Sequence, residues 1–500
     1  MGNYIHTPSF VKWQDVSNNN LSLSPAQYVR LVMPNNNYLS VSQFLKRPLK
    51  RTDLGVEVGS LSYIDKSPVR FIRTKALQKH SFLPDLNSET ALPILPSDFV
   101  QMNLKEGDLL ISKDSNIGEI VILDKDYPNC MLSGAIYRLP VKDEWRYYLL
   151  AFIKHDIFRE QLDFMVPKGA TIRHAKTLFL DCKVPLPTKN VENVICFISS
   201  LTQAIINKEK IIRQRHLAIM QLIDKELEEH QKANRFCYSL PTLEEVKDLG
   251  RLDTNMYNVY FKNEVFGIMN YKNGCQNIEE LGFKLSRGQN LQVSNIGKSI
   301  YSEDWHTGFY TLVLPMFLSK FGTVDEVKYL GNRNPLKTLK KGDLIFGAEG
   351  FEKGRSIVVV EEESNTITNI HGITIQQKTH DLGKAIFVKC FLDYLRSKKL
   401  IDLFAVGGNG GSLAQKYWPY IPFPKFPEAK QKEIVSLYYN AKKYDTSGFT
   451  LENFLEKDNE FNFGAGIYEL DKSAKQLKQI LNKAIDDIVN DRKVEIRFSL

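Results

Sequence analysis

The sequence has 500 residues, of which 43% are hydrophobic and 25% are charged, and its formal net charge is +8 at pH 7. These proportions are ordinary for a folded chain of roughly three or four domains, and the charge permits a polyanionic partner without requiring one. The sequence has no apolar run long enough to cross a membrane, and its start lacks the pattern of a signal peptide. We therefore expect a water-soluble protein of the cytoplasm with no membrane partner.

The six cysteines are scattered along the chain, without the paired spacing of a zinc or redox motif. No cluster of histidines accompanies them. This pattern predicts buried free thiols in a reducing compartment and no metal site.

The first globular unit is expected over residues 1–187. Short apolar runs rich in β-branched residues alternate there with Gly, Asn, Asp and Pro, which predicts strands at 69–73, 109–111 and 119–123. Aromatic residues recur at helical spacing between 144 and 162 and predict a helix over that range. Mixed helix and sheet is the expected content of this unit.

A long helix is predicted next, in the segment 188–235. Apolar residues mark the first and fourth positions of successive heptads, which is typical of a helix packed along another helix. A helix of this length would extend roughly 60 Å. Lys208 and Arg215 interrupt the apolar seam, and we interpret them as solvated charges on buried stems, with contact to a partner or to phosphate as the alternative. The seam consists of Val191, Ile198, Leu201, Ile205, Ile212, Ile219 and Leu222.

A second globular unit with similar patterns is expected over 236–424, with strands near 342–346 and 356–360 and a helix near 385–404. Helical sequence begins again at 428 and resumes at 468. There a second heptad seam includes Leu470, Leu477, Leu481 and Ile488. The stretch 444–466 between these helices is expected to be irregular and has no counterpart in the first unit.

The two units carry the same landmarks in the same order, which indicates a duplication. Lys105-Glu-Gly-Asp108 and Lys340-Lys-Gly-Asp343 each precede an apolar strand, and we assign Gly107-Asp108 and Gly342-Asp343 to turns. Upstream, 23–28 corresponds to 252–257. Downstream, 169–171 corresponds to 410–412, and 184–187 to 421–424. A repeat period above 200 residues is too long for a solenoid.

On these motifs the chain resembles the specificity (S) subunit of type I restriction-modification systems. The resemblance covers almost the whole length and rests on 104–112 with Gly118, 169–172 with His174, 184–187, and 286–296. It implies an α+β fold in which two duplicated mixed α/β target-recognition domains are separated by long antiparallel coiled-coil helices. The implied domains are 1–187 and 236–424, with a central spacer helix at 188–235 and distal spacer helices at 425–500 that contain the insertion near 444–466.

The resemblance also implies a function in phage defence. Each target-recognition domain would read one half of a split sequence in double-stranded DNA. The chain itself would be non-catalytic and would bind two methyltransferase (M) subunits and restriction/translocase (R) subunits. S-adenosylmethionine, ATP and Mg would belong to those partners, and this chain would hold no cofactor.

Candidate DNA-binding residues follow from side-chain chemistry. Arg, Gln and Asn make bidentate contacts to bases, and basic residues beside glycine suit close approach to phosphate. Arg287, Gln289 and Asn290 are placed at the position that matches Arg70, Arg73 and Lys75, and the 352–355 loop at the place of 113–115. Solvated surface positions and ordinary loops are the alternatives. The candidates are Arg70, Arg73, Lys75, Lys113, Ser115, Lys168, Arg173, His174, Lys176, Arg287, Gln289, Asn290, Lys353 and Arg355.

Three other functions compete with this interpretation. An enzyme that reads DNA by itself is disfavoured, because Asn334-Pro-Leu-Lys337 departs from the motif of adenine methyltransferases and Gly297-Lys-Ser299 lacks the first glycine of a phosphate-binding loop. A modification-only or phage-exclusion methyltransferase system would use an equivalent DNA-reading subunit. A helical scaffold that binds protein is the third alternative.

Overall fold

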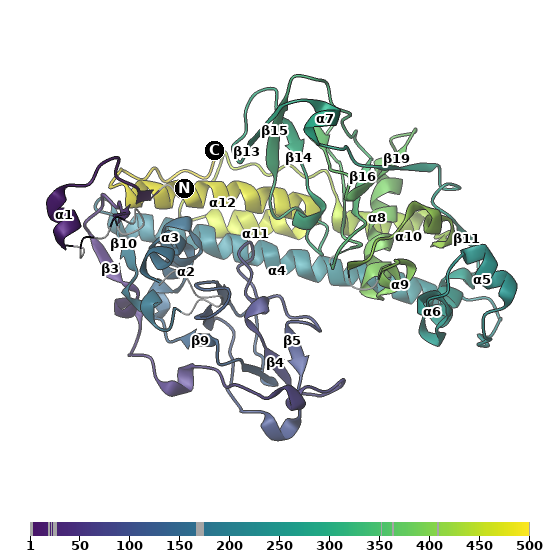
Figure 1. Ribbon diagram of the computed structural model, residues 1–500, viewed down its shortest axis with the longest axis horizontal. Helices are drawn as coiled ribbons and strands as arrows, with labels where there is room; N and C mark the ends of the chain where they lie inside the picture. Colours follow the sequence, from purple (N-terminus) through teal and green to yellow (C-terminus); the bar gives the residue numbers. More distant parts are fainter. Residues whose placement is uncertain are drawn as a thin grey trace. The chain divides into compact units, whose positions relative to one another are not determined.

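The computed structural model describes residues 4–18, 21, 23, 28–166, 175–351, 353–362, 365–407 and 410–499. The fold is α+β, and the chain divides into two compact units (Figure 1). Unit 1 consists of Met1–Lys210, Tyr444–Phe463 and Lys472–Leu500. Unit 2 consists of Ile211–Lys443 and Gly464–Asp471. Each unit is therefore assembled from segments that are distant in sequence.

Unit 1 contains two three-stranded sheets and two short strand pairs. One sheet has the order β5-β4-β8, in which β4 runs antiparallel to β5 and parallel to β8. The other has the antiparallel order β7-β6-β9. The predicted strands at 69–73, 109–111 and 119–123 are confirmed as β4, β6 and β7. The strands are β1 (Ile5–His6), β2 (Arg30–Leu31), β3 (Tyr38–Ser40), β4 (Arg70–Ile72), β5 (Ala91–Pro93), β6 (Leu109–Ser112), β7 (Ile120–Ile122), β8 (Cys130–Leu132), β9 (Ile136–Leu139) and β10 (Lys183–Pro185).

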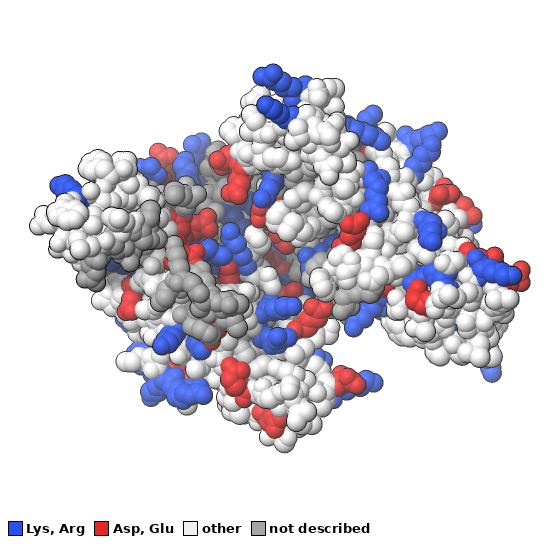
Figure 2. Space-filling view, in the orientation of Figure 1, with Lys and Arg blue, Asp and Glu red and all other residues white. Residues whose placement is uncertain are grey.

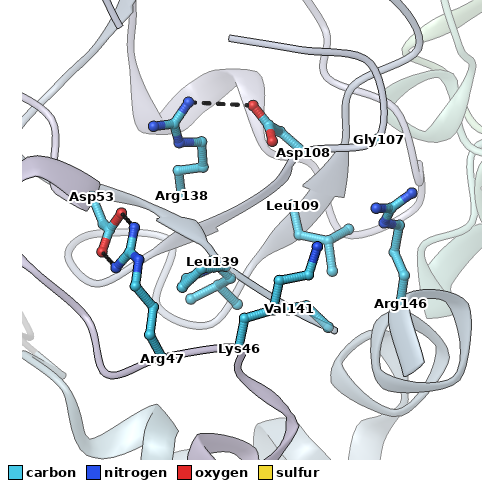
Figure 3. A pocket seen from close by; sticks show the side chains of 11 residues that line it. Lys46, Arg47, Asp53, Gly107, Asp108, Leu109, Arg138, Leu139, Val141 and Arg146 are labelled. Atoms are coloured by element: carbon cyan, nitrogen blue, oxygen red, sulfur yellow. Dashed lines mark hydrogen bonds and ion pairs between the residues drawn. The ribbon is translucent and has the colours of Figure 1, made fainter. Parts of the chain in front are cut away.

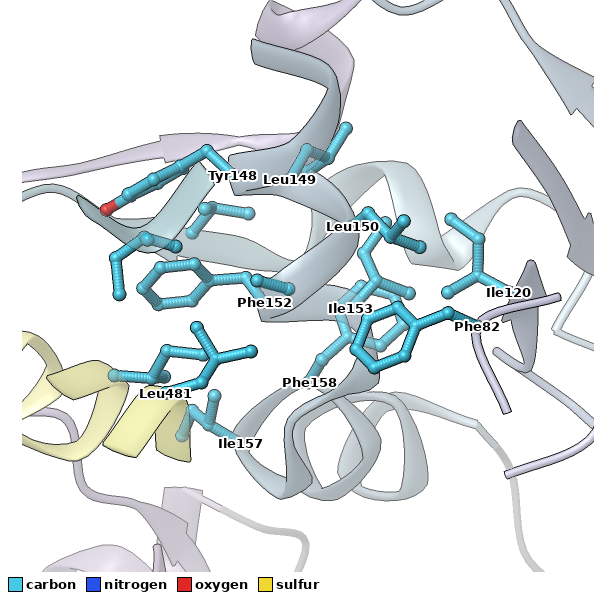
Figure 4. Packing of buried hydrophobic residues seen from close by; sticks show 14 of the residues in the cluster. Phe82, Ile120, Tyr148, Leu149, Leu150, Phe152, Ile153, Ile157, Phe158 and Leu481 are labelled. Carbon is cyan, nitrogen blue, oxygen red and sulfur yellow. The ribbon is translucent and has the colours of Figure 1, made fainter. Parts of the chain in front are cut away.

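The single helix predicted over 144–162 is two helices, α2 (Arg146–Lys154) and α3 (Asp156–Met165). His155 separates them because its backbone is extended and its Nδ1 accepts a hydrogen bond from the Ile157 amide, which caps α3. The apolar faces of both helices are buried in the core of unit 1, where Phe152 and Ile157 lie near Leu481 (Figure 4). A short helix, α1 (Trp13–Asn18), precedes them in the chain.

Unit 2 contains two four-stranded sheets and one short strand pair. The sheet β12-β19-β16-β17 is antiparallel, and in β13-β15-β14-β18 only β14 and β18 pair in parallel. The helix predicted near 385–404 is two helices, α8 and α9. The strands are β11 (Cys275–Gln276), β12 (Phe283–Arg287), β13 (Ser299–Ser302), β14 (Tyr310–Leu312), β15 (Lys328–Asn332), β16 (Leu344–Gly347), β17 (Ser356–Val358), β18 (Thr366–Ile367), β19 (Gly372–Gln377) and β20 (Phe423–Pro424), and the helices are α5 (Leu243–Leu249), α6 (Val259–Met269), α7 (Val293–Ile296), α8 (Leu382–Ser397), α9 (Leu400–Phe404) and α10 (Glu428–Tyr438).

The predicted duplication is visible in the strand pairing. In chain order, β4, β6, β7, β8 and β9 of unit 1 correspond to β14, β16, β17, β18 and β19 of unit 2, because each set makes the same pairs with the same parallel or antiparallel sense. The pair β3–β10 likewise corresponds to β11–β20.

The two Gly-Asp turns have the same geometry, which confirms the assignment. Gly107 and Gly342 have φ of +83° and +85°, the left-handed region that favours glycine. In each turn the aspartate Oδ2 accepts a hydrogen bond from the lysine amide three residues earlier, at 2.9 Å for Asp108 and 2.9 Å for Asp343. The same local chemistry therefore starts β6 and β16.

The predicted long helix is present as α4 (Val191–Glu229), and the second heptad seam lies on α12 (Ile467–Val489). Both helices contribute residues to unit 1 and to unit 2. In unit 1 they are antiparallel, because Glu209 bonds Lys478 at 2.9 Å while Thr188, just before α4, bonds Asp491 at 2.8 Å (Figure 1). The seam residues are buried except Leu222, which is partly buried, and Val191, which is exposed at the first position of α4.

The sequence predicted that the stretch 444–466 is irregular. This prediction is wrong, because the stretch contains α11 (Phe454–Gly464). Phe454 packs against Phe498 with ring centroids 4.2 Å apart, and both belong to the core of unit 1. The sequence hid this helix because five consecutive polar residues, 456–460, separate Phe454 and Leu455 from Phe461 and Phe463, so no apolar residue within it recurs at a spacing of three or four. The segment after unit 2 in sequence therefore completes unit 1.

Lys208 is not a solvated charge. Its side chain is completely buried in unit 1, where Nζ lies 2.8 Å from Asp458 Oδ1 and donates to Asn462 Oδ1 at 2.6 Å. The ring of Tyr444 covers the ammonium at 4.6 Å. The prediction failed because its partners come from residues 444–463, which lie more than 200 positions away and have no local signal.

Candidate nucleic-acid interface

Three loops of unit 2 bring a small group of polar side chains together at the end of β12. Arg287 Nη1 lies 2.7 Å from Glu349 Oε1, and His371 Nδ1 lies 2.7 Å from Glu349 Oε2. Arg287 Nη1 also donates to the Ile370 carbonyl at 3.2 Å. We call Arg287, Glu349, Ile370 and His371 the Arg287 cluster. Partial burial raises the pKa of Glu349, but hydrogen bonds from His371 and Arg287 outweigh it and lower the pKa below its ordinary value.

Backbone packing fixes the position of the Arg287 cluster. Arg287 is opposite Ile373 in the antiparallel ladder, and the next amide, that of Gly288, donates to the Gly372 carbonyl at 2.9 Å. A Cβ on Gly288 would lie 2.0 Å from the Asn369 carbonyl oxygen, so no other residue fits without moving the backbone. Glycine at this position lets the 287–290 strand end and the 369–371 loop meet.

The same crossing occurs in unit 1 at Gly55, whose Cβ would lie 2.0 Å from the Ser133 carbonyl oxygen. Leu54 and Val56 form bridges to Tyr137 and Ser133. Leu54 therefore occupies the place of Arg287. In the neighbouring hairpin loop, Lys113 and Asp114 occupy the places of Ala348 and Glu349. The Lys113 amide donates to the Ala135 carbonyl in unit 1, and the Ala348 amide donates to the His371 carbonyl in unit 2.

The proposed match between Arg70–Lys75 and Arg287–Asn290 is wrong. Arg70 begins β4, whose counterpart is β14, and Arg287 ends β12. Composition suggested the match, whereas strand pairing decides it. Arg70, Arg73 and Lys75 are exposed in unit 1, and Arg70 Nη1 donates to the Ala91 carbonyl at 3.2 Å.

Gln289 and Asn290 use part of their bonding capacity inside unit 2. Gln289 Oε1 accepts from the Lys337 amide at 3.2 Å, and Asn290 Oδ1 accepts from the Gln292 amide at 3.1 Å. Both side chains are partly buried beside the Arg287 cluster. They shape the loop that follows β12.

Lys353 and Arg355 point into unit 2. Lys353 is 5% exposed, and its Nζ lies 3.0 Å from Asp402 Oδ1. Arg355 Nη1 donates to the Leu318 carbonyl at 2.7 Å. These contacts give both residues a role in packing the loop after β16. This loop corresponds to the loop that contains Lys113 and Ser115, but Lys353 and Arg355 occupy later positions in it than Lys113 and Ser115 do.

The remaining candidates lie in or near unit 1. Ser115 is exposed on the hairpin loop and lines a cavity of about 410 Å³ together with Lys79 and Arg159. Lys113 forms an ion pair with Asp114. Lys176 is exposed with a positive φ of 49°. Lys168, Arg173 and His174, and the predicted turn at 169–171, lie outside the described residues.

A basic pocket in unit 1 was missed by sequence reasoning. It has a volume of about 230 Å³ and is lined by Lys46, Arg47, Arg138 and Arg146 together with Asp53 and Asp108 (Figure 3). Arg47 binds Asp53 through two bonds of 2.6 and 2.7 Å, and the hydrogen bond from Arg47 lowers the pKa of Asp53. No motif could have revealed it, because its cations come from three separate parts of the chain.

Lys and Arg side chains are interspersed with Asp and Glu over the face drawn in Figure 2. Among the described residues no helix is long and apolar enough to cross a membrane, and no group of three His, Cys, Asp or Glu side chains is placed to hold a metal ion. Three cysteines are buried as predicted, but Cys196 and Cys237 are exposed and Cys275 is partly buried.

Comparison of the sequence with protein-family models and with curated proteins finds no match. Among solved structures, the chain is similar to the type I restriction-modification S subunit from M. genitalium, with 13% identity, a TM-score of 0.40, and coverage of 91% of this chain and 98% of that one. It is also similar to the HsdS subunit from Thermoanaerobacter tengcongensis, with 12% identity, a TM-score of 0.26, and coverage of 91% and 97%. A third neighbour comes from work on assembly of the type I R-M system, with 11% identity, a TM-score of 0.29, and coverage of 93% and 100%.

Proposed function

We propose that this chain is a non-catalytic, sequence-specific DNA-binding subunit of the type I restriction-modification kind, which reads a bipartite target. One observation carries the proposal: the same strand pairs recur in both units, while the side chains on corresponding loops differ. Unit 1 has Leu54 and Asp114 where unit 2 has Arg287 and Glu349. A repeated scaffold with different loop side chains suits the reading of two different half-sites.

The proposal also includes the binding of partner subunits, and the helices α4 and α12 support this part. We assign to them the binding of two methyltransferase subunits, since both helices contribute residues to unit 1 and to unit 2 and a long helix with a heptad pattern offers an extended surface to partner helices. S-adenosylmethionine, ATP and Mg would be used by the methyltransferase and restriction/translocase subunits. The contribution of this chain would be the choice of DNA sequence.

Methylation-site sequencing tests the proposal. The chain is produced together with an adenine methyltransferase subunit of the type I restriction-modification kind, in a host without adenine methylation of its own. We expect methylation at one split sequence with a fixed gap, and none when this chain is omitted. Methylation that does not depend on the chain, or that occurs at a continuous short site, would contradict the proposal.

A further inference from the structure

We infer that Arg287 reads a guanine in the half of the target that belongs to unit 2, and that Glu349 positions it. This inference rests on the proposed function and names the chemistry of one site within it. Arginine is the side chain that pairs most often with guanine, because two of its N–H groups match the O6 and N7 acceptors in the major groove.

The guanidinium of Arg287 is held on one side only. Both of its contacts use Nη1, at 2.7 Å to Glu349 and 3.2 Å to the Ile370 carbonyl. Within the described parts of the chain, Nε and Nη2 have no hydrogen-bond partner. The side chain is 43% exposed. Two adjacent donors therefore remain for a ligand, on a group whose orientation is already restricted.

The surroundings suit a base edge. His371 is 61% exposed and contacts the second carboxylate oxygen of Glu349. The single carboxylate is therefore bonded on one oxygen by Arg287 and on the other by His371. Phe351 is 80% exposed and Ile370 is 38% exposed at the same loops, and apolar side chains of this kind contact the methyl group of thymine.

The Arg287–Glu349 pair is not required by the fold. Unit 1 forms the same backbone crossing with Leu54 and Asp114 at the corresponding positions. Exposed ion pairs also contribute little to stability. A side chain that is ordered, exposed and dispensable for the scaffold is a candidate for specificity.

The test is a selection from a pool of random-sequence duplex DNA by the full chain in complex with its methyltransferase. The variants are Arg287→Ala, Arg287→Lys and Glu349→Gln. Lys284→Ala is the matched control, because Lys284 is exposed on the same strand, three residues earlier, and faces the opposite side of the sheet. Melting temperatures of all four variants check that the fold is retained.

We expect the unaltered complex to select a guanine at one position of one half-site. Arg287→Ala should reduce that preference roughly tenfold to a hundredfold. Arg287→Lys should also reduce it but should retain the salt dependence of binding, since lysine keeps the positive charge and lacks the two parallel N–H donors of the guanidinium. Glu349→Gln should reduce it severalfold, and Lys284→Ala should leave it unchanged.

The two failures are distinguishable. If the unaltered complex selects a split sequence but Arg287→Ala keeps the same preference at every position, the role of Arg287 is wrong and the proposed function stands. If the unaltered complex selects no sequence, both are wrong. Loss of all binding in Arg287→Lys with an unchanged melting temperature would also overturn the inference, because it would make the residue a general affinity contact.

Discussion

At the scale of single residues, partners that are distant in sequence decide what a charged side chain does. Lys208 lies on a heptad seam, yet it is buried and bound by Asp458 and Asn462. Burial lowers the pKa of its ammonium to about 8, and Asp458 opposes this effect. Asp458 also accepts from the Tyr444 hydroxyl at 2.6 Å. The Lys208–Asp458 ion pair therefore joins α4 to the 444–463 segment inside unit 1.

We predict that Lys208→Met lowers the free energy of unfolding by about 3–5 kcal/mol, because it leaves Asp458 buried without a cation. The double variant Lys208→Met/Asp458→Asn should recover most of this loss, since asparagine can still accept from Tyr444. Chemical denaturation of the full chain measures both, with Lys189→Met, at an exposed position, as the control. A double variant less stable than Lys208→Met would contradict the prediction.

At the scale of elements, the break between α2 and α3 shows how one buried side chain ends a helix and starts another. His155 is buried, its Nδ1 caps α3, and its Nε2 lies 3.5 Å from Asp486 Oδ1 on α12. Burial lowers the pKa of His155 to about 4, with the charge of Asp156 acting in the opposite direction. The neutral imidazole is thus the form that the core of unit 1 accepts.

This shift predicts acid sensitivity. The unfolded chain binds a proton at His155 near pH 6.5, whereas the folded chain does so only near pH 4. The contribution of neutral His155 to the free energy of unfolding is therefore complete above pH 6.5 and is lost as the pH falls through 4. The free energy of unfolding changes by about 3 kcal/mol over this range. The free energy of unfolding, followed by denaturation between pH 7 and 4, should fall less steeply in His155→Asn, which retains an N-cap. Equal slopes would show that His155 does not titrate in this way.

At the scale of the whole molecule, each unit is closed by segments from elsewhere in the chain. The core of unit 1 combines residues of α2 and α3 with Leu481 of α12 and Phe454 of α11. Within this unit, both three-stranded sheets lie between Leu45 and Val141, which form an antiparallel bridge. The Lys46 amide donates to the Pro140 carbonyl at 2.7 Å. Residues 46–140 are therefore a module whose two ends meet.

We predict that this module can be exchanged alone. Under the proposed function, replacement of 46–140 by the corresponding segment of an S subunit from a type I restriction-modification system should change one half of the methylated sequence and leave the other half and the gap unchanged, because β3, α2, α3 and the long helices stay in place. Methylation-site sequencing measures the result, with a chain that carries only the junction substitutions as the control. A change in both halves would mean that the two units do not read DNA independently.

The periodicity of the sequence determined the long helices, and its Gly-Asp turns determined the duplication, because heptads and positive-φ turns act through neighbours in the chain. Only the tertiary structure decided that 444–463 belongs to unit 1, that Lys208 is buried, and that Arg287 corresponds to Leu54. Those features depend on contacts between residues far apart in sequence. Glu349 becomes the shared partner of Arg287 and His371 only when the sheet β12-β19-β16-β17 brings three loops together, and no local pattern records these contacts.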